Sequence, residues 1–278
     1  MKDFDSKLVF IPGGSTGIGL AVAQRLAGLG ADVAIFARRR ETLEAAVQSI
    51  GRQRRRDTQR VVWRQLDVAD AEQVQAVLDA AVGELVVPDV LINCAGRAIP
   101  NYFERITPAQ LDETMRINFY GCWHAISALL PHMRARGGYI VNVSSLAGLI
   151  GVFGYTDYSA SKFALVGFSE ALRSELARHR ITVSVLCPPD TQTPGFEREN
   201  ISKPPETHAA SRAASVMSAE AVADALLAGM AKRAFLIIPG RSARFVHFTK
   251  RFLPRLFEHL MARQTGAATQ KKTGGTMG

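Results

Sequence analysis

The sequence lacks several features that would place it in a specialised class. It has only three cysteines in 278 residues, Cys94, Cys122 and Cys187, each within an apolar run and without the spacing of metal ligands. We therefore expect buried thiols of a reduced compartment, with no disulfide framework and no metal site. No stretch reaches the roughly 18 uninterrupted apolar residues that a membrane-spanning helix requires, and the start, MKDFDSKLVF, lacks the apolar core of a signal peptide. These absences predict a cytoplasmic chain.

The sequence carries an excess of positive charge, with 34 lysines and arginines, 25 acidic residues and a net charge of +9. Such an excess suits an anionic partner, whether nucleic acid, a membrane surface or a phosphorylated cofactor. Aromatic stacking platforms and a groove-reading helix are missing, so we expect no nucleic-acid partner. The basic residues cluster at 51–60, expected to be a solvated connection, and in the C-terminal segment 241–264.

Apolar strand-like runs alternate with amphipathic helical patterns through most of the chain. The predicted strands are residues 7–12, 32–37, 60–66, 89–96, 138–145, 181–188 and 234–239. The predicted helices are residues 17–30, about 38–50, 70–83, 108–134, 157–178 and 218–232. Strands of near-continuous Val, Ile and Leu predict a doubly wound α/β (Rossmann) fold, a single domain with a seven-stranded parallel sheet and helices on both faces. We assign residues 1–240 to this domain and expect a disordered tail at 265–278.

The first predicted strand runs directly into a glycine-rich turn, PGGSTGIG, at the start of the first helix. A phosphate group needs a backbone that it can approach closely and a helix N-terminus whose free N–H groups favour anions. Glycine allows both the approach and a positive φ. Four glycines in seven residues fit poorly with a plain turn, so this turn predicts dinucleotide binding. The predicted contacts are Gly13, Ser15, Thr16, Gly17, Ile18 and Gly19.

The end of the second predicted strand selects the form of the cofactor. An NAD site usually has an acidic residue there to hold the ribose 2′-hydroxyl, but this chain has Ala37 followed by Arg38, Arg39 and Arg40. Guanidinium groups suit a 2′-phosphate, and no carboxylate is present to repel one. We predict NADP(H) as the cofactor, bound through Arg38 and Arg39. Which of the three arginines dominates stays open.

The stretch YSASK places Tyr158 and Lys162 four residues apart, as neighbours on one helical face. A phenol, with a pKa of about 10 in free peptides, is a poor acid at neutral pH, and a nearby ammonium lowers that pKa. Ser145 ends a predicted parallel strand, where open α/β folds bind ligands, so its hydroxyl is able to bind a substrate carbonyl. A Tyr-x-x-x-Lys pattern alone is common on helix surfaces. Together with the glycine turn, NCAG and NVSS, it indicates a catalytic site.

These motifs resemble those of the short-chain dehydrogenase/reductase family across about residues 6–240. The resemblance implies that Tyr158 gives a proton to the reduced carbonyl oxygen and that Ser145 orients and polarises the carbonyl. It implies that Lys162 binds the nicotinamide ribose and lowers the pKa of the tyrosine, while Asn118, in INFYG, holds a water that links the lysine to solvent. The further cofactor contacts that it implies are Asp67, Val68, Asn93, Ala95, Gly96, Tyr158, Lys162, Pro188, Thr191 and Thr193.

Two stretches, PPDTQTPGFEREN and GVFGYTDYSASKFAL, resemble a subfamily, the 3-ketodihydrosphingosine reductases. These enzymes use NADPH to reduce the ketone of a long-chain sphingoid base, and the resemblance implies the same substrate and a place in sphingolipid synthesis. Their arginine after the second strand is matched by Arg38, whereas Thr42 stands where they have a lysine. We therefore expect either a looser phosphate contact or one that Arg39 or Arg40 completes. Eukaryotic members carry membrane-spanning segments, of which this sequence predicts none.

A stiff corner after the sixth predicted strand is expected to close the site. By the resemblance, residues 187–189 form a wall behind the nicotinamide and residues 190–218 form a substrate lid. Glu197 or Glu199 is expected near the mouth, to pair with the amine of a sphingoid base. The residues expected to line an alkyl channel are Phe196, Ala209, Ala210, Ala213, Ala214, Val216 and Met217.

The C-terminal segment 241–264 is basic and amphipathic, with six lysines and arginines against one glutamate. Its apolar residues recur at helical spacing: Phe245, Phe248, Phe252, Leu256 and Leu260. Such a helix suits an anionic membrane surface, although a helix packed on the core or on another subunit would show the same stripe. Because a long-chain substrate is delivered from lipid, we expect peripheral contact with the cytoplasmic face of a membrane.

The expected function is NADPH-dependent reduction of a ketone to a secondary alcohol, in a homodimer or homotetramer. Two other enzymes share this cofactor and mechanism, a 3-oxoacyl-carrier-protein reductase and a hydroxysteroid-type reductase. A non-catalytic dinucleotide-sensing protein is the alternative from another class. Such sensors commonly lose catalytic positions, whereas Asn118, Ser145, Tyr158 and Lys162 are all present here.

Overall fold

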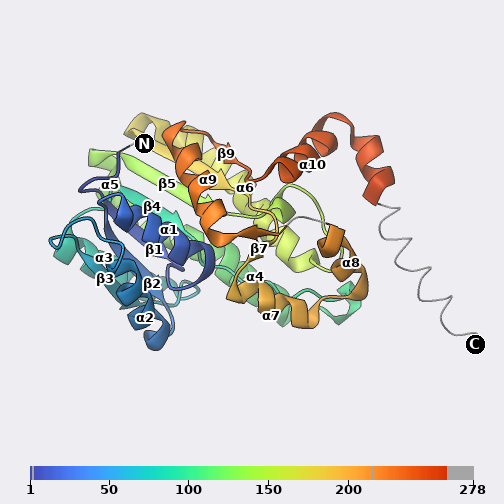
Figure 1. The fold of residues 1–278 in the computed structure, drawn as a ribbon, viewed down its shortest axis with the longest axis horizontal. Coiled ribbons are helices and arrows are strands. Elements are labelled where there is room, and N and C mark those ends of the chain that lie inside the picture. Colours follow the sequence, from blue (N-terminus) through green and yellow to red (C-terminus); the bar gives the residue numbers. More distant parts are fainter. Residues whose placement is uncertain (2, 214–215, 262–278) are drawn as a thin grey trace, which may run out of the picture.

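The computed structural model describes residues 1, 3–213 and 216–261, built around a seven-stranded sheet (Figure 1). Along the sheet the order is β3 (Val61–Gln65), β2 (Asp32–Ala37), β1 (Leu8–Pro12), β4 (Val90–Asn93), β5 (Gly138–Val143), β6 (Ile181–Leu186) and β9 (Leu236–Ile237). Each neighbouring pair of strands is parallel. The order turns back between β1 and β4, which places crossover helices on both faces. The predicted doubly wound α/β fold is confirmed.

Alternate residues of the central strands enter two separate apolar cores. In β1, Val9 and Ile11 belong to the core that contains α1 (Gly17–Gly28), α2 (Arg40–Gly51) and α9 (Ala219–Ala231). Leu8 and Phe10 belong to the opposite core, with α3 (Ala71–Leu85), α5 (Gly121–Arg136) and α6 (Thr156–Leu176). Because successive side chains of a strand point to opposite faces, both must be apolar. This burial on both sides explains the uninterrupted Val, Ile and Leu runs in the sequence.

The parallel register brings the loops after the strands to one edge of the sheet. Pro12, at the end of β1, pairs with Phe36 in β2, and Asn93, at the end of β4, pairs with Asn142 in β5. The motifs after these strands therefore meet at the carboxyl edge, although they lie far apart in the sequence. Short 3-10 turns at Phe103–Arg105, Leu146–Gly148 and Ala177–His179 complete the connections.

The long helix predicted over residues 108–134 is interrupted. It consists of α4 (Pro108–Met115), a π-helical turn (Arg116–Tyr120) and α5, which continues to Arg136. A π turn widens the helix and often occurs at functional sites. The helical periodicity of the sequence does not show this turn, which contains Asn118.

The predicted lid contains two helices that the sequence did not indicate, α7 (Pro194–Ser202) and α8 (Pro205–Ala213). Both begin with proline, which is favoured in the first turn of a helix. Thr193 caps α7 by accepting a hydrogen bond from the Phe196 N–H at 3.1 Å. At the base of the lid, β7 (Thr191–Gln192) pairs with β8 (Met217–Ser218) in a separate two-stranded sheet.

The C-terminal segment forms α10 (Arg241–Phe252), followed by helical residues 254–261, at the end of the molecule where α7 and α8 lie (Figure 1). Pro254 begins the second stretch, in a position that proline favours. The three cysteines are free thiols, and Cys122 and Cys187 are buried, as expected. Residues 262–264 of the segment and the tail 265–278 lie outside the described residues.

Candidate active site

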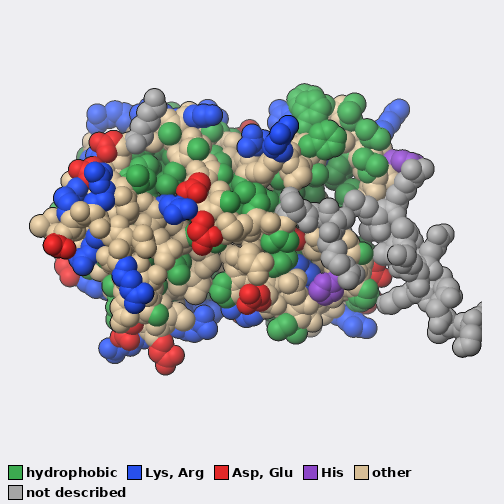
Figure 2. All heavy atoms as spheres, in the orientation of Figure 1, with side chains coloured by type: hydrophobic (Ala, Val, Ile, Leu, Met, Phe, Trp, Pro, Cys, Tyr) green, Lys and Arg blue, Asp and Glu red, His purple; other side chains and the backbone are tan. Residues whose placement is uncertain are grey.

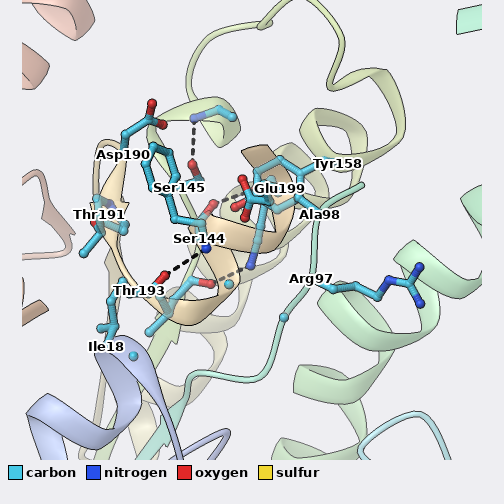
Figure 3. Close-up of a pocket in the computed structure, with 18 of the residues that line it drawn as sticks. Ile18, Arg97, Ala98, Ser144, Ser145, Tyr158, Asp190, Thr191, Thr193 and Glu199 are labelled. Carbon is cyan, nitrogen blue, oxygen red and sulfur yellow. Dashed lines mark hydrogen bonds between the residues drawn. The ribbon is translucent and has the colours of Figure 1, made fainter. Parts of the chain in front are cut away.

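A cavity of about 780 Å³ lies at the carboxyl edge of the sheet, bounded on one side by the lid (Figure 3). Ligands of doubly wound α/β proteins bind at this edge, where the strand order reverses. Nearly all of the predicted site residues line it: Gly13, Ser15, Thr16, Gly17, Ile18, Gly19, Arg38, Arg39, Asp67, Val68, Ala95, Gly96, Ser145, Tyr158, Lys162, Pro188, Thr191 and Thr193. Asn93 and Asn118 do not reach the cavity.

The glycine turn leaves a cradle of bare backbone. Gly13 and Gly17 have φ angles of +83° and +56°, which side chains disfavour. A Cβ on Gly13 would lie 2.6 Å from the backbone of Cys94, and one on Gly19 would collide with the Gly13 carbonyl. At the start of α1, Thr16 provides no side-chain cap and the first turn has no acidic residue. The first N–H groups and the helix dipole are therefore available to a phosphate group.

The three arginines after β2 have different positions. Arg38 and Arg39 line the cavity together with Thr42. The Arg38 side chain is 62% exposed and lies 3.9 Å from the Asp67 carboxylate, so it is free to turn toward a phosphate. Arg40 lies outside the cavity lining, where it binds Glu44 at 2.7 Å. This arrangement favours Arg38 and Arg39 over Arg40 as phosphate contacts.

Asn93 is placed differently from the prediction that it contacts the cofactor. It is 1% exposed, and its amide donates a hydrogen bond to the Asn142 side chain at 2.9 Å within the sheet. The neighbouring turn instead brings Gly96 to the cavity, where a Cβ would lie 3.3 Å from both Asn118 Oδ1 and Lys162 Nζ. The motif thus supplies backbone rather than an asparagine side chain to the site.

Ser145 and Tyr158 meet in the cavity from two elements (Figure 3). Lys162, on the same helix as Tyr158, lines the cavity as well. Ser145 follows β5, and its oxygen accepts a hydrogen bond from the Ala147 N–H at 3.1 Å. Lys162 Nζ donates to the Val143 carbonyl at 2.9 Å and lies 5.7 Å from the centre of the Tyr158 ring. The Ser145 hydroxyl also forms a hydrogen bond with Tyr158, so the two groups lie next to each other in the cavity.

Burial raises the pKa of Tyr158, the charge of Glu199 raises it further, and a hydrogen bond with Ser145 opposes the rise. The net shift of this pKa is upward, and a lowering contribution from Lys162 stays a prediction. The physical reason for the upward shift is desolvation, which disfavours the phenolate and also lowers the pKa of the buried Lys162. A raised phenol pKa keeps the tyrosine protonated at neutral pH, the form in which it is able to donate a proton.

Asn118 is fully buried in the π-helical turn. Its Oδ1 accepts a hydrogen bond from the Arg97 N–H at 2.8 Å, and its Nδ2 donates to the Arg97 carbonyl at 2.9 Å and to Ser161 at 3.0 Å. The side chain therefore holds the loop after β4 against α6. A water held by Asn118 stays a prediction.

The corner after β6 forms a wall of the cavity, as the sequence indicated for residues 187–189. Pro188 and Pro189 line it, while Cys187 is fully buried behind them. Thr193 lies against the glycine turn, since a Cβ on Gly17 would be 3.1 Å from its side chain. The loop that begins the predicted lid therefore lies beside the glycine turn.

Two polar residues of the cavity, Tyr155 and Glu199, are joined by a hydrogen bond that the sequence did not predict. Glu199, on α7, lines the cavity, and its Oε2 accepts a hydrogen bond from the Tyr155 hydroxyl at 3.1 Å. Glu197 is exposed and lies outside the lining. We did not single out Tyr155 from the sequence. Its position three residues before Tyr158, at the N-cap of α6, was the available signal.

The apolar part of the cavity comes from a different segment than expected. Of the predicted channel residues, Phe196 lines it, whereas Ala209, Val216 and Met217 do not. Ala214 lies outside the described residues. The C-terminal segment supplies apolar lining instead: Ala243, Phe245, Val246, Phe257, Leu260 and Met261. The amphipathic helix was predicted, but its contact with the cavity was not.

The protein has a doubly wound sheet, with a glycine turn, a serine, a tyrosine and a lysine at one edge. These features place it in the class of α/β proteins that bind ligands at the carboxyl edge of the sheet. Residues 7–203 match the profile of the short chain dehydrogenase family. Because this match covers most of the chain, the protein belongs to that family.

Two curated relatives share the same coverage. A 3-ketodihydrosphingosine reductase of Bos taurus and a 3-dehydrosphinganine reductase of Danio rerio are each 40% identical over 217 residues, 77% of this chain. The chain spans 65% of the length of either relative. Among solved structures, a short chain dehydrogenase/reductase from Burkholderia phymatum in complex with NAD has a TM-score of 0.80 at 24% identity, covering 92% of this chain and 96% of its own. At that identity the likeness concerns the fold.

Proposed function

We propose that the protein is an NADPH-dependent reductase that converts 3-ketodihydrosphingosine, the ketone of a long-chain sphingoid base, to dihydrosphingosine in sphingolipid synthesis. The observation that carries the proposal is that Ser145, Tyr158 and Lys162 share one cavity with the glycine turn. The names of the Bos taurus and Danio rerio relatives support this choice of substrate. A homodimer or homotetramer stays a prediction.

The chain's own residues supply the proton and the orientation of the ketone. The chemistry that a bound nicotinamide dinucleotide supplies is hydride transfer to the carbonyl carbon. Ser145 donates its O–H to the carbonyl oxygen, and Tyr158 gives that oxygen the proton that completes the alcohol. Lys162, fixed to the Val143 carbonyl at 2.9 Å, provides the positive charge that favours the resulting phenolate.

The cavity fits a 2′-phosphorylated dinucleotide in both shape and charge. Bare backbone at Gly13 and Gly19 allows a pyrophosphate to approach, and the start of α1 supplies N–H groups. Arg38 and Arg39 line the end where a 2′-phosphate would lie, and Ala37 offers no carboxylate to compete for the ribose. We propose NADPH over NADH for this reason.

A test of the proposed function follows the oxidation of NADPH with ketones of different kinds and lengths. We expect 3-ketodihydrosphingosine to be reduced faster with NADPH than with NADH. Shorter 2-amino-3-ketones should be slower, because each methylene buried contributes about 0.8 kcal/mol, or about fourfold in kcat/KM. If acetoacetyl thioesters or steroid ketones are reduced faster, the sphingoid-base substrate is wrong and only the proposal of ketone reduction is retained. If NADPH binds and no ketone is reduced, the protein is a dinucleotide-binding sensor.

The C-terminal helices expose an apolar surface beside the cavity, which we call the C-terminal face. It comprises Phe245, Phe248, Phe252, Leu253, Leu256 and Leu260, each between 44% and 67% exposed. Figure 2 shows hydrophobic side chains gathered in this part of the molecule, with lysine and arginine beside them. The exposed arginines of the segment are Arg241, Arg244, Arg251 and Arg255.

We propose that the C-terminal face contacts an anionic membrane surface, because it combines exposed phenylalanines with positive charge. Phe245 and Leu260 belong to the face and also line the cavity, so an alkyl chain leaving the lipid would meet the cavity there. Over the described residues, no helix combines the length and the apolar character needed to cross a bilayer. The contact proposed is therefore one at the membrane surface.

A further inference from the structure

A carboxylate that carbonyl reduction does not require lies inside the cavity. Glu199 points from α7 toward Tyr158 (Figure 3), and its charge is close enough to affect the pKa of that tyrosine. Its Oε2 accepts the hydrogen bond from Tyr155 at 3.1 Å, and the Tyr155 and Tyr158 rings are 5.5 Å apart. The carboxylate is thus held beside the proposed proton donor.

Glu199 lies near two ammonium groups, whose charges lower its pKa, but it pairs with neither: they belong to Lys203 and Lys162. Among the residues that the structure describes, no lysine, arginine or histidine forms an ion pair with it. Lys203 Nζ donates to Ser211 at 3.3 Å and lies 4.0 Å from the centre of the Phe196 ring. Lys162 is bound to the Val143 carbonyl. A carboxylate taken out of water is stable only when charges or hydrogen bonds compensate it. Here the Tyr155 hydroxyl is the one side-chain donor described for Glu199, and the charges of Lys203 and Lys162 act on the carboxylate without forming an ion pair.

The surroundings of Glu199 favour an incoming cation. Burial raises the pKa of Glu199, and Asp190, another carboxylate of the cavity, raises it as well, whereas the Tyr155 hydrogen bond and the charges of Lys203 and Lys162 lower it. Burial also raises the pKa of Tyr155, which keeps its hydroxyl a donor and leaves the carboxylate as the acceptor. A positive group placed here would satisfy Glu199 and relieve its repulsion from Asp190.

We infer that Glu199, oriented by Tyr155, binds the ammonium group of a 2-amino-3-ketone, an inference that rests on the proposed function. In such a substrate the amine is attached to the carbon next to the carbonyl. A carboxylate that holds it must therefore lie next to the groups that act on the carbonyl, and Glu199 lies next to Tyr158. Glu197, on the exposed side of α7, has no part in this site.

Binding of the ammonium also acts on the proton donor. The negative charge of Glu199 raises the pKa of Tyr158, so an ammonium paired with Glu199 offsets that effect and makes the tyrosine a stronger acid. A substrate that carries the ammonium is therefore bound more tightly than a neutral ketone of the same length. Its carbonyl oxygen also receives the proton of Tyr158 more readily.

The test compares 3-ketodihydrosphingosine with its N-acetylated analogue, which has the same chain but no ammonium, in the wild type and in Glu199→Gln. We expect Glu199→Gln to lower kcat/KM for the amine about 10-fold to 100-fold, since a hydrogen bond to a charged group is lost. The N-acetylated ketone should change much less, so the preference for the amine collapses. Tyr155→Phe should reduce that preference by a smaller factor, and Glu197→Gln, the matched control on the same helix, should leave it unchanged.

The outcomes separate this site from the proposed function. If the wild type reduces both ketones equally well, or if Glu199→Gln lowers both rates by the same factor, the ammonium site is wrong and the reductase stands. If the wild type reduces neither ketone while it binds NADPH, the proposed function fails and the ammonium site fails with it. NADPH binding and the melting temperature of each variant show whether a loss comes from misfolding.

Discussion

The amine of Lys162 lies 5.7 Å from the centre of the Tyr158 ring, one turn further along α6. The hydrogen bond of 2.9 Å to the Val143 carbonyl fixes this lysine to the end of β5. The distance between the Lys162 ammonium and the Tyr158 phenol is therefore set jointly by β5 and α6. Removing only the Tyr158 hydroxyl should leave the positions of Lys162 and of the Tyr158 ring unchanged.

Tyr158→Phe removes the transferable proton and keeps the ring. We expect ketone turnover to fall by at least about 10²–10⁴, the usual contribution of a general acid, while NADPH still binds. Turnover is measured by NADPH oxidation and binding by fluorescence titration. Tyr102→Phe is the matched control, because the Tyr102 hydroxyl binds Glu206 and the residue does not line the cavity. A Tyr158→Phe variant that retains most of its activity would refute the assignment.

Arg38→Asp replaces an attractive group for a 2′-phosphate with a repulsive one and offers an acceptor to the 2′-hydroxyl of NADH. The NADPH to NADH ratio of kcat/KM should fall about 10-fold or more, given the strength of hydrogen bonds to charged groups. Arg40→Asp is the control, since Arg40 binds Glu44 away from the cavity. An unchanged ratio in Arg38→Asp, with a reduced one in Arg39→Asp, would assign the selectivity to Arg39.

Gly96→Ala should reduce activity without unfolding the protein. The added Cβ would lie 3.3 Å from Asn118 Oδ1 and from Lys162 Nζ, so either side chain must shift by a few tenths of an ångström. We expect a fall in kcat of about 10-fold, because catalytic groups tolerate little misplacement. The control is Gly83→Ala in α3, where a Cβ meets nothing within 4 Å. That variant should gain about 1 kcal/mol of stability and keep full activity; full activity in Gly96→Ala would contradict the argument.

Phe248→Glu combined with Phe252→Glu places two charges in the C-terminal face without touching the cavity lining. If the face contacts membrane, the wild type should sediment with vesicles that contain phosphatidylserine, and the variant should not. Binding of the wild type should weaken as salt rises, because charge attraction is screened. Phe103→Glu, at a residue 74% exposed outside the face, serves as the control. Equal sedimentation of both proteins, or a change in oligomeric state by light scattering, would make the face a protein contact instead.

The parts of the fold that the sequence predicted are those that repeat a simple physical pattern. Each strand of the seven-stranded sheet was predicted, since burial on both faces demands continuous apolar residues such as Val9 to Ile11. The glycine turn was predicted because Gly13 and Gly17 need a positive φ that other residues avoid. The strand β9 is shorter than its apolar run because only Leu236 and Ile237 pair with β6.

The rest depended on packing between distant segments, which a local pattern does not reveal. The helices α7 and α8 are polar and begin at prolines, so they lack the apolar stripe that marks a core helix. Glu197 and Glu199 were equivalent in the sequence, and only the direction of α7 places one inside the cavity. In the same way, the contact of Leu260 with the cavity depends on where the C-terminal helices fold back.

The pairing of β7 with β8 has a consequence for how substrate range could change within this architecture. Thr191 and Met217 are partners, so the 24 residues between Gln192 and Met217 start and finish at nearly the same point in space. A segment whose two ends are neighbours can be replaced by a segment of different length or sequence. The replacement only has to join β7 to β8, and it does not have to pair with a strand of the seven-stranded sheet. Under the proposed function, selection on that segment would alter which ketone is accepted, while Ser145, Tyr158 and Lys162 keep their positions after β5 and on α6.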